Sequence, residues 1–355
     1  MKWWRYVLLV MCTFTSLAFA QEEAPEGVLD QETPENIVIP DLPPLPAANV
    51  RQGIMGVWVR PSPAQNVAAL MADLKKEGYT DVFIETFYHG MTIYPSAVAP
   101  MRPELTGRDL LNEFAEAAAF SGLRLHAWLE VFYWAPPKQY GISGGLLDEH
   151  PEWETLSASG VRSRDTGLHM GFADPALFEV RQVVYNLSAE LAENYPEVGL
   201  HLDYLRYPSK DDFGYHPQSV ATFEKQTASK ASVTNMKWYS FRQDVLAQAA
   251  SGMSKAYREA GGKGLVTAAV NAYYPLYKPE TQQVWTRWKG IDVFIPMAYS
   301  TNVSALKVLA YTLRSRSPRP LWMGLQVGPG YPGLTHQINA LKPQGFSNYV
   351  VFGRK

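Results

Sequence analysis

Short apolar segments alternate with longer amphipathic segments from residue 51 to the end of the chain, and this alternation limits the possible folds more than any other feature. Eight segments are typical of buried strands, at residues 54–60, 81–86, 123–132, 199–204, 265–271, 291–299, 320–327 and 349–352. Helical patterns lie between them, at residues 64–78, 109–120, 174–194, 236–260, 282–289, 302–315 and 334–341. Strands joined by crossover helices predict an α/β protein with a single closed (β/α)8 (TIM) barrel rather than an open sheet.

Three local features refine this prediction. Asp174-Pro175 is expected to cap the helix that ends near residue 194. Very few residues follow Phe352, so we expect no eighth helix. Insertions at residues 135–173 and 209–235 follow the third and fourth strands, on the face where a TIM barrel carries its chemistry, and are expected to form the walls of a substrate groove.

The first 50 residues are expected to stay outside the barrel domain, which we place at residues 51–355. Residues 1–20 have a basic start, an apolar run and an Ala18-Phe19-Ala20 cleavage pattern, which together indicate a secretion signal. Residues 21–50 contain six prolines, seven acidic residues and no Lys or Arg, so we expect an extended linker. Cys12, in the signal, is the only cysteine, which agrees with export to an oxidising compartment. We therefore expect a secreted or periplasmic protein without stable membrane insertion after cleavage.

Charge and aromatic content limit the classes of partner that we expect. The net charge of −2 becomes −4 when Lys2 and Arg5 leave with the signal, which gives no reason to expect a nucleic-acid partner. The chain has 10 Trp and 20 Tyr, a surplus that first of all fills a core but also suits a glycan-binding groove, since flat side chains stack on sugar rings.

Three carboxyl groups lie at or near the carboxyl ends of predicted strands. They are Glu85, Glu130 and Asp203, and parity along each strand turns all three toward the inside of the barrel. Two of them also have a structural explanation, since Glu85 can pair with Arg60 and Asp203 can pair with Arg206. For Glu130 a functional role is favoured, because a purely packed position would rarely be a carboxylate. Three carboxyl groups at one barrel mouth nevertheless favour a functional site.

The chemistry that such an arrangement suits is glycoside hydrolysis. One carboxyl group must protonate the leaving oxygen, while an ionised partner attacks the anomeric carbon or activates water. The aromatic surroundings of Glu130 predict a raised pKa and the role of the acid, and Arg206 is expected to keep Asp203 ionised. Other residues expected to bind substrate are Arg60, His126, Trp128, Trp134, His201, Arg206, Tyr207, Asn271, Tyr299 and Gln326. The histidines among them are more often satisfied core residues than ligands, and we expect no metal and no cofactor.

At these residues the chain resembles the glycosyl hydrolase-like 10 family, a group of (β/α)8 barrels that includes bacterial cell-envelope proteins. The resemblance lies in the segments GVWVRP, YPS, HAWLE, FADPALFEVR and LHLDYLRYP, and it extends from about residue 51 to the end of the chain. It implies cleavage of an envelope polysaccharide or of peptidoglycan strands without peptides, with Asp203 and Arg206 at the positions of the most specific motif. Glu130 and Glu85 depart from the pattern of many members.

A second resemblance, to family 18 chitinases, rests on Met297-Ala298-Tyr299 at the sixth strand. Those enzymes need a glutamate at the position of Leu205, so their substrate-assisted chemistry is not expected here. Two other function classes remain open. One is a barrel that binds glycan without cleaving it, and the other is a metal-dependent carbohydrate deacetylase using His126, His201 and Asp203.

Overall fold

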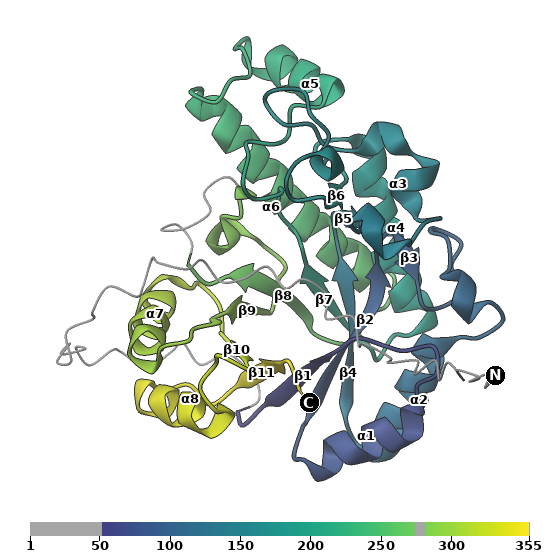
Figure 1. The fold of residues 1–355 in the computed structure, drawn as a ribbon, viewed down its shortest axis with the longest axis vertical. Helices are drawn as coiled ribbons and strands as arrows, with labels where there is room; N and C mark the ends of the chain where they lie inside the picture. Colours follow the sequence, from purple (N-terminus) through teal and green to yellow (C-terminus); the bar gives the residue numbers. More distant parts are fainter. Residues whose placement is uncertain (1–51, 274–280, 355) are drawn as a thin grey trace, which may run out of the picture. The chain divides into compact units, whose positions relative to one another are not determined.

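The computed structural model describes residues 52–273 and 281–354, which form a closed barrel of eight parallel strands (Figure 1). The expected signal peptide and linker lie outside the described residues. The barrel strands are β1 (Met55–Val59), β2 (Asp81–Tyr88), β4 (Arg124–Glu130), β7 (Gly199–Asp203), β8 (Val266–Asn271), β9 (Val293–Met297), β10 (Met323–Gln326) and β11 (Tyr349–Phe352). Pairing of β1 with both β2 and β11 closes the cylinder, so the predicted (β/α)8 barrel is confirmed.

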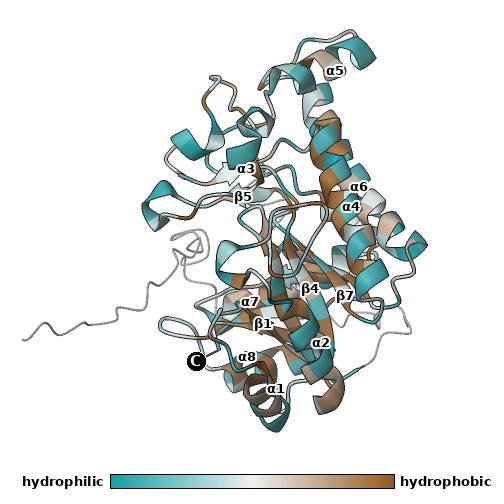
Figure 2. Ribbon diagram, turned by 90° about the vertical axis from the view of Figure 1, so that its right-hand side faces the viewer, coloured by the Kyte–Doolittle hydropathy of each residue, from teal (hydrophilic) through white to brown (hydrophobic). Residues whose placement is uncertain are grey.

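Helices surround the barrel at most of the predicted places. They are α1 (Val67–Lys76), α2 (Leu110–Ser121), α4 (Phe178–Asn194), α6 (Met236–Glu259), α7 (Val303–Arg316) and α8 (Leu334–Leu341). In Figure 2 these helices alternate between brown hydrophobic and teal hydrophilic residues, as expected for helices that cover a sheet with one face. Within the described residues no helix follows β11, as expected, and none is long and apolar enough to cross a membrane.

Two predictions about helices are wrong. The segment 282–289 contains only a single 3-10 turn, Trp285–Arg287, because Gln282 adopts a left-handed conformation (φ 55°) and the Gln283 side chain accepts a hydrogen bond from the Asn271 amide. Asp174 does not cap α4, which begins at Phe178 without a side-chain cap. The Asp174 carboxylate instead accepts hydrogen bonds from the Thr155 and Ser219 hydroxyls and from the Ala176 amide.

The core consists of two hydrophobic clusters, one outside the cylinder of strands and one inside it. The larger one lies between the strands and the helices. The smaller one fills the cylinder and consists of Ile54, Trp58, Phe83, Trp128, Ala269, Val293, Ile295, Trp322 and Val350. Phe83 and Trp128 belong to this interior cluster, which confirms the parity assigned to their strands and therefore turns Glu85 and Glu130, two residues further along, to the same side.

The two insertions lie at the carboxyl-terminal end of the barrel and pack on each other. The first begins at the end of β5 (Tyr133–Ala135), which pairs antiparallel with β6 (Gly171–Phe172), and it contains the short helix α3 (Leu146–Glu149). The second contains α5 (Pro217–Thr227). A bridge joins Ser157 to Phe213, and the Gly214 amide donates to the Thr155 hydroxyl. Figure 1 shows α3, β5, β6 and α5 together on one side of the barrel.

Candidate active site

Glu130 and Asp203 are register partners at the ends of the adjacent parallel strands β4 and β7. Neighbouring strands lie about 4.8 Å apart, so the two carboxyl groups share the same edge of the sheet at close range. The Asp203 carboxylate accepts hydrogen bonds from the Trp128 indole nitrogen (3.2 Å) and from the Tyr204 amide (2.6 Å). Glu130 accepts a hydrogen bond from the backbone amide of His89 (3.2 Å). The carboxylates predicted to work together are thus neighbours in the fold.

Glu85 joins the site through an ion pair with Arg60 at the end of β1. The distance from Arg60 Nε to Glu85 Oε1 is 3.2 Å, so the structural explanation considered for Glu85 holds. Glu85 also acts on Glu130 through its charge, which raises the pKa of Glu130. The Arg60 guanidinium lies 5.6 Å from the centre of the Trp128 ring and 5.5 Å from that of Phe352. Arg60 and Glu85 therefore form one connected group with the carboxyl pair.

Burial decides the protonation of this group. Only 1% of Glu130 is exposed, and its burial, together with the charge of Glu85, raises its pKa well above the usual value. Burial also raises the pKa of Glu85, although the Arg60 charge opposes this. Burial raises the pKa of Asp203 to about 6, because the Tyr204 amide and the Arg206 charge offset the loss of hydration only in part. Arg206 lowers the pKa of Asp203 as expected, but burial outweighs it and the net shift is upward. Glu130 thus keeps its proton to a higher pH than an ordinary glutamate, whereas Asp203, with a pKa of about 6, is largely ionised at neutral pH.

Two aromatic residues and two amides complete the ends of the strands. The Tyr299 ring stacks on Phe352 with centroids 6.2 Å apart, and its pKa is raised by burial and by the nearby charge of Asp203. Asn271 ends β8 and its side-chain oxygen accepts from the Tyr273 amide, while Gln326 ends β10 and is 4% exposed. Arg206 lies 4.8 Å from the centre of the Tyr204 ring. Of the predicted substrate-binding residues, Arg60, Trp128 and Arg206 lie beside the carboxyl groups, whereas Asn271, Tyr299 and Gln326 lie at or just after the ends of other barrel strands.

The other predicted residues lie elsewhere. His126 is at the amino-terminal part of β4, where its Nε2 pairs with Asp81 Oδ1 at 2.9 Å. His201 accepts a hydrogen bond from the Trp58 indole at Nε2 (3.0 Å), and its Nδ1 contacts the Thr267 hydroxyl (2.8 Å). Its pKa is well below the usual value because of burial, so the ring is neutral. Both histidines belong to the packed interior rather than to the mouth.

Trp134 and Tyr207 are completely buried. The Trp134 indole donates to the Val131 carbonyl (2.8 Å), and its ring packs on Phe87 and Trp153. The Tyr207 ring lies 5.9 Å from the Arg242 guanidinium under the second insertion. In the structure these aromatic residues hold the insertions in place.

Sequence reasoning missed His89 and Arg102. His89 has a left-handed conformation (φ 54°) in the turn after β2, and this turn aims its amide at Glu130. Arg102 is 7% exposed and its charge lowers the pKa of Glu85, although Arg102 is paired with Glu104. The His89-Gly90 dipeptide directly after a strand was a usable signal for a tight turn, whereas nothing in the local sequence points to Arg102.

The deacetylase alternative finds no support in this geometry. Within residues 52–273 and 281–354 no group of three His, Cys, Asp or Glu side chains has the arrangement of a metal site. Both ring nitrogens of His201 already contact protein partners, and His126 lies four residues below the end of its strand. These residues do not converge on Asp203.

Comparison with known proteins adds the family. A family model described as glycosyl hydrolase-like 10 matches residues 51–320. No curated protein matches the sequence.

Three solved structures with the same fold illustrate the structural likeness. α-L-Fucosidase isoenzyme 2 from Paenibacillus thiaminolyticus has a TM-score of 0.59 at 14% identity, over 85% of this chain and 46% of that one. The β-galactosidase from Marinomonas ef1 has a TM-score of 0.61 at 14% identity, over 85% of this chain and 54% of that one. The β-galactosidase from Rahnella sp. R3 has a TM-score of 0.61 at 12% identity, over 87% of this chain and 51% of that one. The chain thus spans about half the length of these proteins, and the likeness concerns the barrel fold.

Proposed function

The chain belongs to the glycosyl hydrolase-like 10 family, and from this membership and the geometry at the strand ends we propose that it hydrolyses O-glycosidic bonds with a pair of carboxyl groups. The observation that carries the proposal is the register pairing of Glu130 with Asp203 on adjacent strands. An acid and its ionised partner need different environments, and the two groups have them. Burial and the charge of Glu85 raise the pKa of Glu130 well above its usual value, whereas the Tyr204 amide and the Arg206 charge limit the rise at Asp203 to about 6.

In the proposed mechanism Glu130 gives its proton to the glycosidic oxygen as the bond from that oxygen to the anomeric carbon breaks. Asp203 attacks the same carbon from the opposite side and forms a covalent glycosyl ester. Glu130, now ionised, then removes a proton from water, whose oxygen displaces Asp203. The hydrolysis consumes one water, and both carboxyl groups return to their starting states.

We propose retention of anomeric configuration because the two strands are in register. Retaining glycosidases hold their carboxyl groups roughly 5–5.5 Å apart, whereas inverting ones need about 6.5–9.5 Å to admit a water. Adjacent strands about 4.8 Å apart, with both residues at the same level, favour the shorter separation. The anomer released first, read by proton NMR, distinguishes the two outcomes.

For the substrate we propose an envelope polysaccharide or peptidoglycan glycan strands without peptides, and for the location the periplasm or the outside of the cell. The family resemblance supports the substrate class, and the predicted secretion signal of residues 1–20 supports the location. A cell fractionation that finds the protein in the cytoplasm would contradict the second part.

The experiment that tests the function is incubation of the purified protein with defined glycans, including peptide-free peptidoglycan and chitooligosaccharides, with products identified by mass spectrometry. Asp203→Asn should lower hydrolysis by a factor of about 10³ or more, because the amide cannot attack the anomeric carbon. Binding measured by calorimetry should survive in this variant.

The burial of Glu130 and the Arg60–Glu85 ion pair favour one second candidate, a barrel that binds glycan without cleaving it. Such a protein would bind one of these glycans with similar affinity before and after the Asp203→Asn change. It would release no product from any of these glycans. That result would show that the protein binds glycan and does not hydrolyse it.

A further inference from the structure

The proton-donating group of the proposed mechanism is held by a turn that belongs to another part of the barrel. Glu130 ends β4, but its Oε2 accepts a hydrogen bond from the His89 amide in the turn between β2 and β3 (Met91–Thr92). His89 has a φ of 54° and Gly90 a φ of 72°, and a non-glycine residue adopts this left-handed conformation only when its surroundings hold it there. The direction of the His89 amide therefore depends on what packs against the turn.

The first insertion packs against it at Gly145. A Cβ atom built at Gly145 would lie far inside the 3.4 Å of ordinary contact from the His89 carbonyl oxygen. On the other side, a Cβ at Gly90 would lie 2.7 Å from the Leu146 nitrogen, whose amide donates to the Gly90 carbonyl (3.2 Å). The two backbones touch directly, which is possible only because both residues lack side chains.

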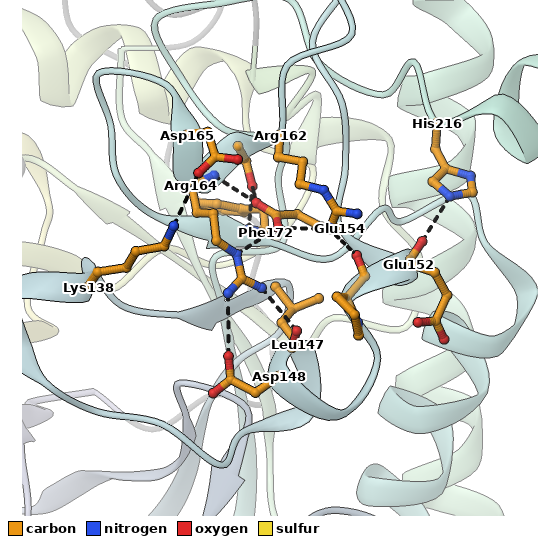
Figure 3. A network of polar contacts seen from close by, with 12 residues as sticks. Lys138, Leu147, Asp148, Glu152, Glu154, Arg162, Arg164, Asp165, Phe172 and His216 are labelled. Carbon is orange, nitrogen blue, oxygen red and sulfur yellow. Dashed lines mark hydrogen bonds and ion pairs between the residues drawn. The ribbon is translucent and has the colours of Figure 1, made fainter.

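The helix α3, which begins directly after Gly145, is held by a mostly buried arginine, Arg164. Arg164 donates to the carbonyl of Leu147 (3.0 Å), pairs with Asp148 (3.4 Å) and donates to Glu154 (2.7 Å) (Figure 3). Only 1% of Glu154 is exposed, and it also accepts from the Ser163 hydroxyl (2.8 Å). The start of α3, directly after Gly145, is thus tied to the centre of the insertion by charge-assisted hydrogen bonds.

We propose that the insertion at residues 135–173 positions the acid of the site, and that Gly145 is its positioning residue because it lets the insertion hold the His89-Gly90 turn against Glu130. The proposal goes beyond the expectation that the insertion only forms a wall of a groove. Its catalytic consequence rests on the proposed function, whereas its structural content does not.

The sign of the effect follows from the hydrogen bond. An amide that donates to a carboxylate favours the ionised form and lowers its pKa, so loss of the His89 bond should raise the pKa of Glu130 further. For a hydrolase the alkaline limb of the rate profile would move to higher pH, while kcat would fall because the acid is less well aimed. The ionisable groups that face Glu130 are Glu85 on β2, Arg60 after β1, Asp203 on β7, and the phenols of Tyr88 and Tyr133.

The test compares two glycine-to-alanine changes in the same insertion. Gly145 has φ −85° and ψ 171°, which alanine adopts without strain, so Gly145→Ala acts through its contact with the His89-Gly90 turn. Gly167→Ala is the matched control, since Gly167 has no left-handed φ and a Cβ there would have no neighbour within 4 Å. The titration of Glu130 is followed by NMR on carboxyl-labelled protein, with Glu130→Gln to assign the signal.

We expect Gly145→Ala to raise the midpoint of the Glu130 titration, to speed hydrogen exchange at His89 and Gly90, and to lower kcat about tenfold with little change in KM. Gly167→Ala should match the unchanged protein in the titration midpoint, in hydrogen exchange, in kcat and in KM. A folded Gly145→Ala protein with unchanged titration and exchange would overturn the proposal. Absence of turnover in the unchanged protein would contradict the proposed function alone, because titration and exchange still report on the positioning.

A second variant covers the case in which Gly145→Ala does not fold. Arg164→Lys keeps the positive charge but loses the planar fork that reaches Glu154 and Leu147 together. It should shift the Glu130 titration in the same direction by a smaller amount. An Arg164→Lys protein that exchanges the His89 amide as slowly as the unchanged protein would count against the proposal.

Discussion

The Trp128 indole on β4 donates a hydrogen bond of 3.2 Å to the Asp203 carboxylate on β7. Trp128 is two residues before Glu130, so one strand carries both the proposed acid and the group that holds its partner. The Arg60 guanidinium lies 5.6 Å from the centre of the same ring. Trp128 therefore contacts two charged residues of the site, Asp203 and Arg60, from the strand that ends at Glu130.

We expect Trp128→Phe to lower kcat/KM by about ten- to a hundredfold, since a hydrogen bond to a charged group contributes roughly 1.5–3 kcal/mol. Loss of a donor to the ionised form raises the pKa of Asp203 above its present value of about 6, so the acidic limb of the rate profile should move to higher pH. Trp322→Phe is the matched control, because the buried Trp322 indole nitrogen has no hydrogen-bond partner among the described residues. Equal effects of the two changes would contradict the assignment.

Glu85→Gln should move the alkaline limb of the rate profile to lower pH. The negative charge of Glu85 raises the pKa of Glu130, so its removal lets Glu130 lose its proton earlier and the acid form disappears sooner as pH rises. Glu104→Gln serves as control, since Glu104 also pairs with an arginine (2.8 Å to Arg102) but is 41% exposed. Rate profiles of the two variants between about pH 4 and 9 give the comparison, and an unmoved limb in Glu85→Gln would refute the coupling.

Asp81→Asn should destabilise the fold at neutral pH by about 2 kcal/mol. The pKa of Asp81 is lowered to about 2, because hydrogen bonds and charge from His126 and hydrogen bonds from Arg124 and Thr80 outweigh its burial. A lowered carboxyl pKa stabilises the native state above the unfolded value near pH 4, and this contribution disappears as pH falls toward about 2. Urea unfolding from pH 7 down to pH 3 should show the gap to the unchanged protein shrinking below about pH 4. The exposed Asp73→Asn should show no such gap.

His201→Gln should reduce the loss of stability in mild acid. His201 stays neutral in the fold because burial lowers its pKa, while the unfolded chain binds a proton below about pH 6.5. The unchanged protein therefore loses about 1.4 kcal/mol per pH unit from this group below that value. Chemical unfolding between pH 7 and 5 measures the slope, and His126→Gln provides a comparison within the same interior. A large change in KM with an unchanged slope would instead support the prediction that His201 binds substrate.

The local sequence sufficed for the elements and for the positions of the carboxyl groups along them. Periodicity places Glu85, Glu130 and Asp203 at or near the ends of strands because side chains alternate strictly along a strand. The helix predicted at residues 282–289 failed for the opposite reason. Gln282 is left-handed, and the buried Gln283 side chain accepts a hydrogen bond from the Asn271 amide, and no local pattern reveals either feature.

What the sequence by itself determined is the barrel and the set of residues that face its interior, because strand and helix periods are properties of neighbouring residues. What only the tertiary structure decided is how strongly each carboxyl group holds its proton and what aims it. Burial outweighs Arg206 at Asp203, and the amide that holds Glu130 comes from His89, 41 residues away, in a turn pressed by Gly145. Desolvation and backbone contact act between groups that are close in space, and only the closed barrel brings these groups together.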